Sequence, residues 1–498
     1  MPMREPEPCV LALDLGSSSL RAVVYDAAGR LREDVPTVQL AYAWTATSDG
    51  GMETTADALF ALTVQLLDRC VEGVRAAGAT IAAVGVATFW HSLLGVGADG
   101  APLTPVYGWG DLRAAGAALR LRERVDEAAV HARTGCFLHP SYPSARLLWL
   151  RDAAGDTFPR VRGWVSFGEY LELRLFGVRR CSLSMASGTG LLDLARCAWD
   201  AEMLAAVGIG AGALSPLVDT DAPGPALFPD WARRWPELAG AVWVPPVGDG
   251  ACANVGSGAV GAGRVGVTVG TSAAVRALWQ GEPVAVPPGV WCYRLDRRRL
   301  VMGRALSNAG NAAAWLRRTL LLPPAEELEA AAAAMEPDAH GLTVVPTLLG
   351  ERAPGWERWS GAATLGLRQA TQPVEIFRAW MEAVAFRIAD ALDALEGALG
   401  PTERILASGG ALHASPTWTG ILADVLGRTV TLDAVAEATS RGAALVALER
   451  IGLAGAREAA SPPDGAAFAA DPARHARYRA ARERQRRAEA LLDTREST

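Results

Sequence analysis

The sequence predicts an α/β protein made of two related halves, and two observations carry this prediction. An apolar strand, a turn of small residues and a second strand follow one another twice, about half a chain apart. Each of these segments is followed, much later, by an amphipathic helix and then a buried strand. Because the chain has 498 residues, more than one hydrophobic core usually supports, we expect two domains of roughly 200 to 250 residues each.

The first hairpin is predicted from the segment VLALDLGSSSLRAVVY, with strands over residues 10–13 and 21–25 joined by small residues. The later segment VGVTVGTSAAVRALW repeats this order. There we expect a strand over 265–269, a turn over 270–272 and a second strand around 275–278. The two segments therefore look like copies of one unit.

Each half also has a helix and a strand in the same order. The helices are predicted from apolar residues at helical spacing, namely Leu59, Leu62, Leu66, Cys70 and Val74 in the first half and Phe377, Met381, Val384, Ile388, Leu392 and Leu395 in the second. The strands IAAVGVATF and RILASGG follow them. Pro373 suits the first turn of the second helix and Gly400 its end. With two α/β halves, a ligand is expected in the crevice between them.

We place the domain boundary after a loop-like, proline-rich stretch and the short strand AVWVPP. The first domain then covers residues 9–248 and the second covers residues 249–455. Residues 456–498 are heavily charged and helical in period, which predicts a solvated terminal helix.

The composition excludes several classes of protein. Half of the residues are hydrophobic and 20% are charged, which is typical of compact globular domains. A net charge of -6 gives no reason to expect a nucleic acid partner. Without a long apolar run we expect a cytoplasmic protein that has no membrane partner. The seven cysteines are scattered and never form a Cys-x-x-Cys pair, so we expect core residues rather than disulfides or a zinc site.

All 48 basic residues are arginine. A Walker A loop needs a lysine, so this chain cannot contain one. If the protein handles a nucleoside triphosphate, then backbone amides, hydroxyls, arginine and a metal ion must hold it instead.

The two small-residue turns are suited to phosphate. Gly16-Ser17-Ser18-Ser19 and Gly270-Thr271-Ser272 can point several N–H groups and hydroxyls at one anion. Asp14, just before the first turn, either caps that turn or binds Mg²⁺ shared with phosphate oxygens, because Mg²⁺ favours one or two carboxylates plus water. Arg21 either neutralises phosphate or lies on the outer face of its strand.

Asp249 is the single carboxylate in the segment GDGACANVGSGAVG. A helix that begins near this residue would place the carboxylate at its N-terminus, where an ordinary helix cap is one explanation. The small neighbours Gly248, Gly250 and Ala251 favour another, because they would leave room for a substrate. A carboxylate beside an alcohol can accept its proton while the oxygen attacks phosphorus.

Taken in order, these motifs resemble those of the FGGY family of carbohydrate kinases. Members of this family have two domains of the actin, hexokinase and Hsp70 ATPase fold, which is ribonuclease H-like, with a cleft between them. The resemblance runs from about Val10 to Gly452 and includes DLGSSSLR, VGDGACANVGSGAVG, VGTS, ALSNAGNAAAWL and SGGALHASPTW. It implies a kinase that uses ATP and Mg²⁺, with Asp249 as the general base.

The resemblance also implies which residues meet the nucleotide and the sugar. Asp14 and Asp249 would lie near Mg²⁺. The residues expected at ATP are Gly16, Ser17, Ser18, Arg21, Gly270, Thr271, Gly310, Gly409, Gly410 and Ala411. Those expected at the sugar are Trp90, His91, Asp111, Tyr142 and Asp249. Trp90 and His91 also fit an ordinary core. Glu351 and Arg352, in LLGERAPGW, are expected near the cleft.

Within the family the pattern is most similar to that of gluconate kinases, through RTGCFLHPSYPSARLLWLR, LSMASGTGLLDLARCAWD and GERAPGW. This likeness implies phosphorylation of D-gluconate to 6-phosphogluconate. The carboxylate of the sugar acid would be met by a cation or aligned donors, and the available groups are Arg113, Arg146, His91 and His139.

Two alternatives remain. Gly110 and Trp90 stand where a larger residue and a methionine are usual in the family, so a xylulose-, ribulose- or cyclitol-type kinase is an alternative substrate class. Outside this class, an actin-like ATPase could act on a protein partner. For assembly, the family resemblance implies a homodimer.

Overall fold

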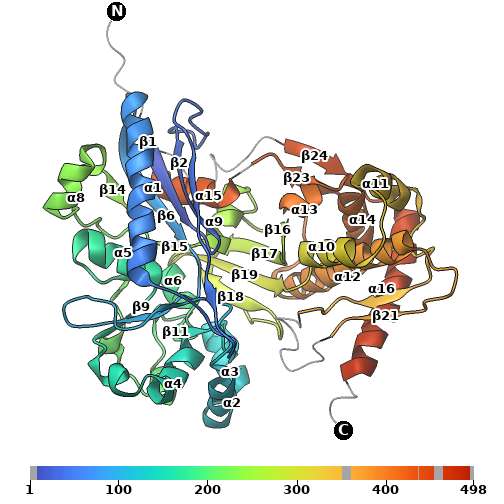
Figure 1. The fold of residues 1–498 in the computed structure, drawn as a ribbon, viewed down its shortest axis with the longest axis horizontal. Coiled ribbons are helices and arrows are strands. Elements are labelled where there is room, and N and C mark those ends of the chain that lie inside the picture. The colour runs from blue at the N-terminus through green and yellow to red at the C-terminus, as the bar shows by residue number, and fades with distance from the viewer. Residues whose placement is uncertain (1–7, 350–360, 436, 454–463, 494–498) are drawn as a thin grey trace, which may run out of the picture.

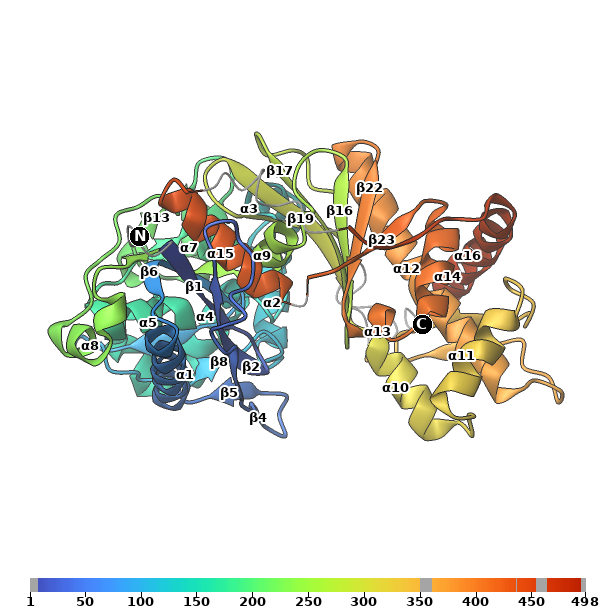
Figure 2. The same ribbon diagram turned by 90° about the horizontal axis from the view of Figure 1, so that it is seen from above.

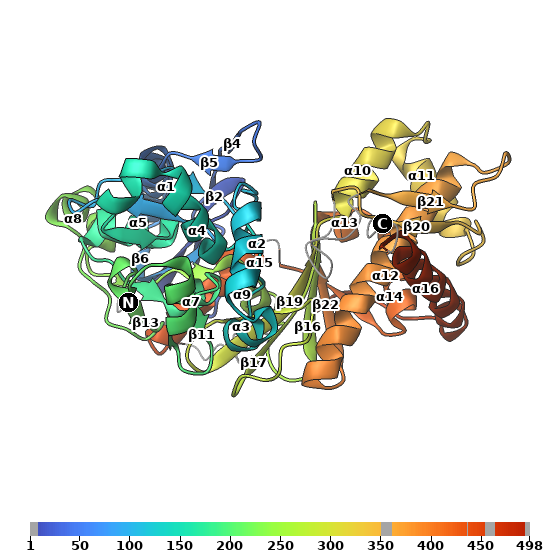
Figure 3. The ribbon, with the colours of Figure 1, turned by 90° about the horizontal axis from the view of Figure 1, so that it is seen from below.

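The computed structural model describes residues 8–349, 361–435, 437–453 and 464–493. These residues form two lobes, with the strands β16, β17 and β19 lying between them (Figures 1, 2 and 3). One sheet lies in the N-terminal lobe, and the other, which includes these three strands, extends from between the lobes into the C-terminal lobe.

The sheet of the N-terminal lobe is built on the first hairpin. β1 (Pro8–Leu15) pairs antiparallel with β2 (Ser19–Tyr25) and parallel with β6 (Thr80–Thr88). The strand order is β14-β6-β1-β2-β3, and β15 also pairs with β6. The outer strands are β3 (Val38–Ala41), β14 (Val242–Trp243) and β15 (Val247–Gly248).

The second sheet repeats this arrangement. Its order is β18-β19-β17-β16-β22-β23-β24. The strands are β16 (Arg264–Val269), β17 (Ala273–Gln280), β18 (Trp291–Arg294), β19 (Arg299–Leu306), β22 (Arg404–Ser408), β23 (Val430–Asp433) and β24 (Asp464–Phe468). The order β19-β17-β16-β22-β23 matches β3-β2-β1-β6-β14, with the same strand directions throughout. The predicted duplication and the ribonuclease H-like fold class are confirmed.

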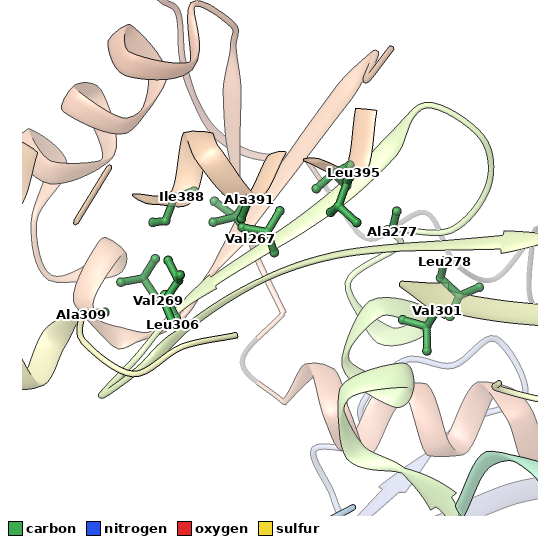
Figure 4. Packing of buried hydrophobic residues seen from close by; sticks show 14 of the residues in the cluster. Val267, Val269, Ala277, Leu278, Val301, Leu306, Ala309, Ile388, Ala391 and Leu395 are labelled. Carbon is green, nitrogen blue, oxygen red and sulfur yellow. The ribbon is translucent and has the colours of Figure 1, made fainter. Parts of the chain in front are cut away.

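The predicted helices precede the parallel strands as expected. α1 (Ala56–Ala76) leads into β6, and α12 (Pro373–Leu399) leads into β22. Pro373 is in the first turn of α12 and Gly400 follows its last residue, as the sequence predicts. Ile388, Ala391 and Leu395 of α12 face Val267 and Val269 of β16 (Figure 4). All five are at most 1% exposed, and a fully buried valine, leucine or isoleucine side chain contributes about 1.5–3 kcal/mol.

Two helices close the space between the sheets. α9 (Asp249–Gly256) follows the first sheet, and α15 (Ala438–Arg450) follows β23. Although α15 comes late in the chain, it packs against α9, β1 and β6 in the N-terminal lobe (Figures 1 and 2). The C-terminal part of the sequence therefore completes the N-terminal lobe.

The predicted terminal helix is present as α16 (Pro472–Asp493), but it is not a solvated appendage. It packs against α12 and α14 (Pro416–Leu426), and β24 before it pairs with β23. Tyr478 is 1% exposed, and its hydroxyl accepts a 2.7 Å hydrogen bond from Arg378. The prediction failed because buried residues at helical spacing, Tyr478, Ala481, Gln485 and Ala488, are hidden among many charges.

The other helices of the N-terminal lobe are α2 (Ala115–Arg124), α3 (Glu127–Thr134), α4 (Pro143–Ala153), α5 (Phe167–Phe176), α6 (Leu183–Ser187), α7 (Ala201–Val207) and α8 (Pro229–Arg234). Its short strands are β4 (Thr45–Ala46), β5 (Met52–Thr54), β7 (Leu94–Val96), β8 (Val106–Tyr107), β9 (Gly163–Val165), β10 (Cys181–Ser182), β11 (Leu192–Asp193), β12 (Ala198–Trp199) and β13 (Leu217–Val218). The C-terminal lobe adds α10 (Gly310–Thr319), α11 (Ala325–Ala334), α13 (Gly410–His413), β20 (Thr343–Val345) and β21 (Ala363–Leu365).

No disulfide joins the seven cysteines, all of which lie in the described part of the chain. Six of them are buried and Cys197 is partly exposed, consistent with their predicted place in the core. Among the described residues, no helix is both long and apolar enough to cross a membrane.

Candidate active site

A cavity of about 300 Å³ lies between the lobes, and both contribute to its walls. The N-terminal lobe and α9 supply Ser17, Phe89, Trp90, His91, Trp109, Phe137, Ser141, Tyr142, Asp249 and Gly250. The second sheet supplies Ser272, Ala273, Ala274, Arg276, Trp291, Tyr293 and Ala305. The wall thus combines residues of both small-residue turns, an acid, a cation and a ring of aromatic side chains.

Asp249 is the first residue of α9, as predicted, and its carboxylate is partly exposed in the cavity wall. Its Oδ1 accepts a 2.8 Å hydrogen bond from the backbone N–H of Gly250. Burial raises the pKa of Asp249, while the Gly250 amide and the positive charge of Arg276 act in the opposite direction. A carboxylate with a raised pKa is a better proton acceptor near neutral pH than an ordinary one.

The small residues around Asp249 have a role in packing. A Cβ at Gly248 would overlap the indole of Trp90, and one at Gly250 would lie 2.7 Å from its Cζ3. Trp90 is 7% exposed, and its Nε1 donates a 3.0 Å hydrogen bond to the carbonyl of Ser184. These glycines therefore make room for Trp90, which forms part of the cavity wall, and Gly250 itself also borders the cavity.

Asp14 lies behind the cavity wall and is 4% exposed. Arg21 on the neighbouring strand is paired with it at 3.4 Å and with Glu437, before α15, at 3.6 Å. Burial, and then the negative charge of Asp249, raise the pKa of Asp14 to about 7. Asp14 and Asp249 therefore lie close enough to repel each other, and a cation between them would relieve this repulsion.

The first turn is held by two aromatic residues. The Tyr42 hydroxyl donates a 2.9 Å hydrogen bond to the Gly16 carbonyl, and Trp44 Nε1 donates a 2.6 Å bond to the Ser17 carbonyl. Ser18 is exposed, and Ser17 borders the cavity. With these two carbonyls held, the backbone of the turn is fixed at Gly16 and Ser17.

The second turn is joined to two later glycine segments. The N–H of Gly310, at the start of α10, donates a 2.9 Å hydrogen bond to the carbonyl of Gly270, and Asn311 bonds the carbonyl of Thr271 in the same way at 3.0 Å. Gly409 precedes α13 with a φ of +100°, and a Cβ there would overlap the carbonyl of Val269. A Cβ at Gly310 would lie 3.6 Å from Ala411. The structure thus brings the predicted nucleotide residues of the C-terminal lobe together.

On the predicted sugar side, His91 and Tyr142 border the cavity. His91 has a φ of +65°, unusual for a residue with a Cβ, and its Nδ1 lies 2.6 Å from the carbonyl of Gly188. Because a carbonyl only accepts, Nδ1 carries the hydrogen. The Tyr142 hydroxyl lies 2.6 Å from that of Tyr293, which joins the two lobes across the cavity.

Asp111 and three of the candidate cations do not border the cavity. Asp111 is fully buried in an ion pair with Arg113, which also pairs with Glu53 at 2.6 Å. Arg146 is fully buried and donates to the carbonyl of His91. The Nδ1 of His139 accepts a 3.1 Å hydrogen bond from Ser141. Glu351 and Arg352 lie outside the described residues.

Sequence reasoning missed several residues of the wall, above all Arg276. This arginine and Ala274 border the cavity from alternate positions of β17. The available signal was the single charge in the segment AAVRALW, directly after the second turn. Trp291 and Tyr293 of β18 gave no comparable signal, because aromatic residues in apolar strands usually belong to the core. Trp109, in the turn after β8, was also missed.

Comparison with known proteins agrees with this geometry. Residues 9–256 match the N-terminal domain of the FGGY family of carbohydrate kinases, and residues 265–449 match its C-terminal domain. The chain belongs to this family. It is therefore a carbohydrate kinase, a phosphotransferase, rather than an actin-like ATPase that acts on a protein partner.

Individual relatives differ in the substrate that their names state. The chain is 27% identical to a gluconokinase of Bacillus licheniformis, over 89% of this chain and 88% of that one. It is 32% identical to a glycerol kinase of Thermus brockianus, over 87% of this chain and 88% of that one. A crystal structure of a gluconate kinase from Lactobacillus acidophilus superposes with a TM-score of 0.91 at 24% identity, covering 98% of both chains.

Proposed function

We propose that this kinase transfers the γ-phosphoryl group of ATP to the terminal hydroxyl of D-gluconate, which yields 6-phosphogluconate. The observation that carries the proposal is the position of Asp249 in a cavity that also contains Ser17 and Ser272, one from each small-residue turn. The gluconokinase relative and the gluconate kinase structure favour a sugar acid as substrate.

Asp249 would act as the general base. One of its oxygens is held by the Gly250 amide, so the carboxylate keeps its orientation. It accepts the proton of the substrate hydroxyl while that oxygen attacks the γ-phosphorus and the bond to the β-phosphate breaks. The residues of the two turns, with Gly310, Gly409, Gly410 and Ala411, would hold the nucleotide so that donor and acceptor are aligned.

Asp14 and Asp249 are the residues that would hold Mg²⁺. Their proximity and the raised pKa of Asp14 fit a site for a divalent cation. In the described part of the chain no three His, Cys, Asp or Glu residues are arranged around a metal position, which suits Mg²⁺ because it keeps water and phosphate as its other ligands. When bound, the ion neutralises charge on the phosphates.

A kinase for a neutral substrate, such as glycerol or xylulose, is the second candidate. The identity of 32% to a glycerol kinase favours it. A coupled assay of ADP release over gluconate, glycerol, xylulose and ribulose separates the two. We expect the highest kcat/KM with gluconate, and a higher value with any neutral substrate would refute the choice of substrate.

The role of Asp249 is tested with Asp249→Asn. We expect this variant to lower kcat by about 10²- to 10⁴-fold, because an amide cannot accept the proton. Its affinity for gluconate, measured by calorimetry, should stay within a few-fold of the original. A kcat within tenfold of the unmodified enzyme would show that another group is the base.

A further inference from the structure

We propose that Arg276 binds the carboxylate of the sugar-acid substrate and so sets the preference of this kinase for acids over neutral polyols. The inference rests on the proposed function, since it names the residue that recognises the acid end of the substrate. Arg276 is not among the cations that the sequence nominates for the carboxylate.

Arg276 is the cation best placed for this role. Within the described residues, it is the one arginine in the wall of the cavity. Arg113, which the sequence nominates, is committed to Asp111 and Glu53. Arg146, also nominated, is fully buried, donates to the carbonyl of His91 and does not border the cavity. A carboxylate that enters this cavity therefore meets Arg276 or remains without an arginine partner.

The guanidinium of Arg276 is fixed from two sides. Nε donates a 3.0 Å hydrogen bond to Oδ1 of Asn254, and Nη2 donates a 2.9 Å bond to the hydroxyl of Thr268. Asn254 is 1% exposed and donates in turn to the backbone carbonyl of Arg276 at 3.1 Å. Thr268 is itself bonded to Ser408 at 2.9 Å. A cation held in this way is pre-organised, so that little conformational freedom is lost when a ligand binds.

The remaining nitrogen, Nη1, has no hydrogen-bond partner among the residues that the structure describes. Arg276 also forms no ion pair within 4.0 Å with Asp249, although the two lie near enough for their charges to interact. The positive charge of Arg276 is therefore not neutralised by a direct ion pair with Asp249. Arginine donors in such a position are suited to a carboxylate, which they bind through charge-assisted hydrogen bonds.

The two ends of the substrate would then be bound through one helix. Asp249 begins α9, and Asn254 in the same helix holds Arg276. Trp90 and Trp291 give part of the cavity wall an apolar surface. Burying a carboxylate there without a cation would be unfavourable, whereas a neutral hydroxymethyl group needs no such partner. This difference is the physical basis of the proposed selectivity.

The test compares gluconate with D-glucitol, the neutral polyol that carries a hydroxymethyl group in place of the carboxylate. For the unmodified enzyme, Arg276→Gln and Arg276→Lys, calorimetry gives the Kd of each compound and the coupled assay gives kcat and KM. Arg264→Gln, on the adjacent strand but outside the cavity wall, is the matched control. Circular dichroism shows whether each variant is folded.

For Arg276→Gln we expect the Kd and KM of gluconate to rise by about 10- to 150-fold, the range for loss of a hydrogen bond to a charged group. The values for D-glucitol should change less than threefold. Arg276→Lys, which keeps the charge, should retain part of the preference, and Arg264→Gln all of it. If Arg276→Gln is not folded, Arg276→Lys decides the test. An Arg276→Lys variant that lowers kcat/KM equally for gluconate and D-glucitol overturns the proposal.

Two results overturn the inference alone. If the unmodified enzyme prefers gluconate and Arg276→Gln keeps that preference, the carboxylate is bound elsewhere. If the variant lowers kcat equally for both compounds with unchanged Kd values, Arg276 positions Asp249 rather than the substrate. If the unmodified enzyme itself phosphorylates neutral polyols better than any sugar acid, the proposed function has failed, and the inference fails with it.

Discussion

Asp14 illustrates how a candidate site residue can oppose the stability of its own fold. Its carboxyl is almost fully buried, and the group that carries a compensating charge, Arg21, lies 3.4 Å away and is shared with Glu437. The resulting pKa of about 7, against an ordinary 3.8, means that the folded protein holds a proton that the unfolded chain releases. Rising pH therefore favours unfolding at this residue.

We predict that Asp14→Asn stabilises the protein while it abolishes phosphoryl transfer. The penalty for ionising Asp14 begins near the ordinary pKa, grows as the pH rises toward 7 and is constant above that. Three pKa units correspond to about 4 kcal/mol at most, and loss of the contact with Arg21 reduces the gain to roughly 1–3 kcal/mol. Urea unfolding at pH 5 and pH 8, with chelator and without nucleotide, measures this gain in the free energy of unfolding.

The gain should be larger at pH 8 than at pH 5, because the carboxyl of the unmodified protein is still protonated at the lower value. An equal gain at both pH values would show that the asparagine acts through packing instead. In that case the raised pKa would not be the cause.

At the scale of single residues, the sequence predicts the cavity residues that belong to a recognisable motif. It misses those that reach the cavity only through contacts with residues distant in sequence. Ser17, Trp90, His91, Tyr142 and Asp249 were all predicted, and all border the cavity. In the sequence, Arg276 looks like any charged residue on the outward face of a strand. What distinguishes it is Asn254, which lies 22 positions away in sequence and holds its Nε. Such a contact is created only by the packing of α9 on the second sheet.

At the scale of elements, the small-residue segment that begins at Gly248 is explained by close packing. A Cβ at Gly256 would overlap the carbonyl of Ala438, and a Cβ at Gly442 would overlap the carbonyl of Cys252. The backbones of α9 and α15 are therefore in direct contact. Since α9 begins with Asp249, the position of the carboxylate depends on this crossing.

We predict that Gly442→Ala destabilises the protein by about 1–3 kcal/mol, the usual cost of overpacking. Gly420→Ala is the matched control, because Gly420 is also inside a helix, α14, and no described atom outside that helix would lie within 4 Å of its new Cβ. There the higher helix propensity of alanine should add up to about 1 kcal/mol. Urea midpoints and kcat should be measured for both variants.

In addition, Gly442→Ala should affect kcat more strongly than KM. It displaces α9 and with it Asp249, so kcat should fall. If both alanines stabilise the protein alike, the two helices are not in the contact that the structure shows.

Helix ends and turns were predictable because local rules decide them. Pro373 and Gly400 mark the ends of α12, and both small-residue turns occur where the hairpin pattern places them. The path of α15 was not predictable, since nothing in its own sequence indicates that it leaves the lobe of its neighbour β23 for the sheet of β1. The need for Gly442 in α15 becomes clear only from the structure, where a Cβ at this position would overlap the carbonyl of Cys252.

At the scale of the whole molecule, the duplication places one small-residue turn, the proposed phosphate-binding element, on each lobe. The edge of the second sheet is fixed to the N-terminal lobe, because the N–H of Cys292 bonds the carbonyl of Gly135 at 2.9 Å and His131 bonds that of Val290 at 2.8 Å. The cluster of Gly270, Gly310 and Gly409 lies at the other side of that sheet. A nucleotide that contacts both turns would therefore be held by both lobes.

We predict that the lobes close when both ligands are bound. A nucleotide held by both turns draws them together, and closure excludes water from the reacting groups. The radius of gyration from small-angle X-ray scattering should fall with gluconate and a non-hydrolysable ATP analogue together, and fall less with either alone. Asp249→Asn should close in the same way, because on the proposed mechanism it still binds both ligands and lacks only the proposed base. If the scattering is unchanged with both ligands present, the structure already has the catalytic arrangement, and the alignment of donor and acceptor must arise without movement of the lobes.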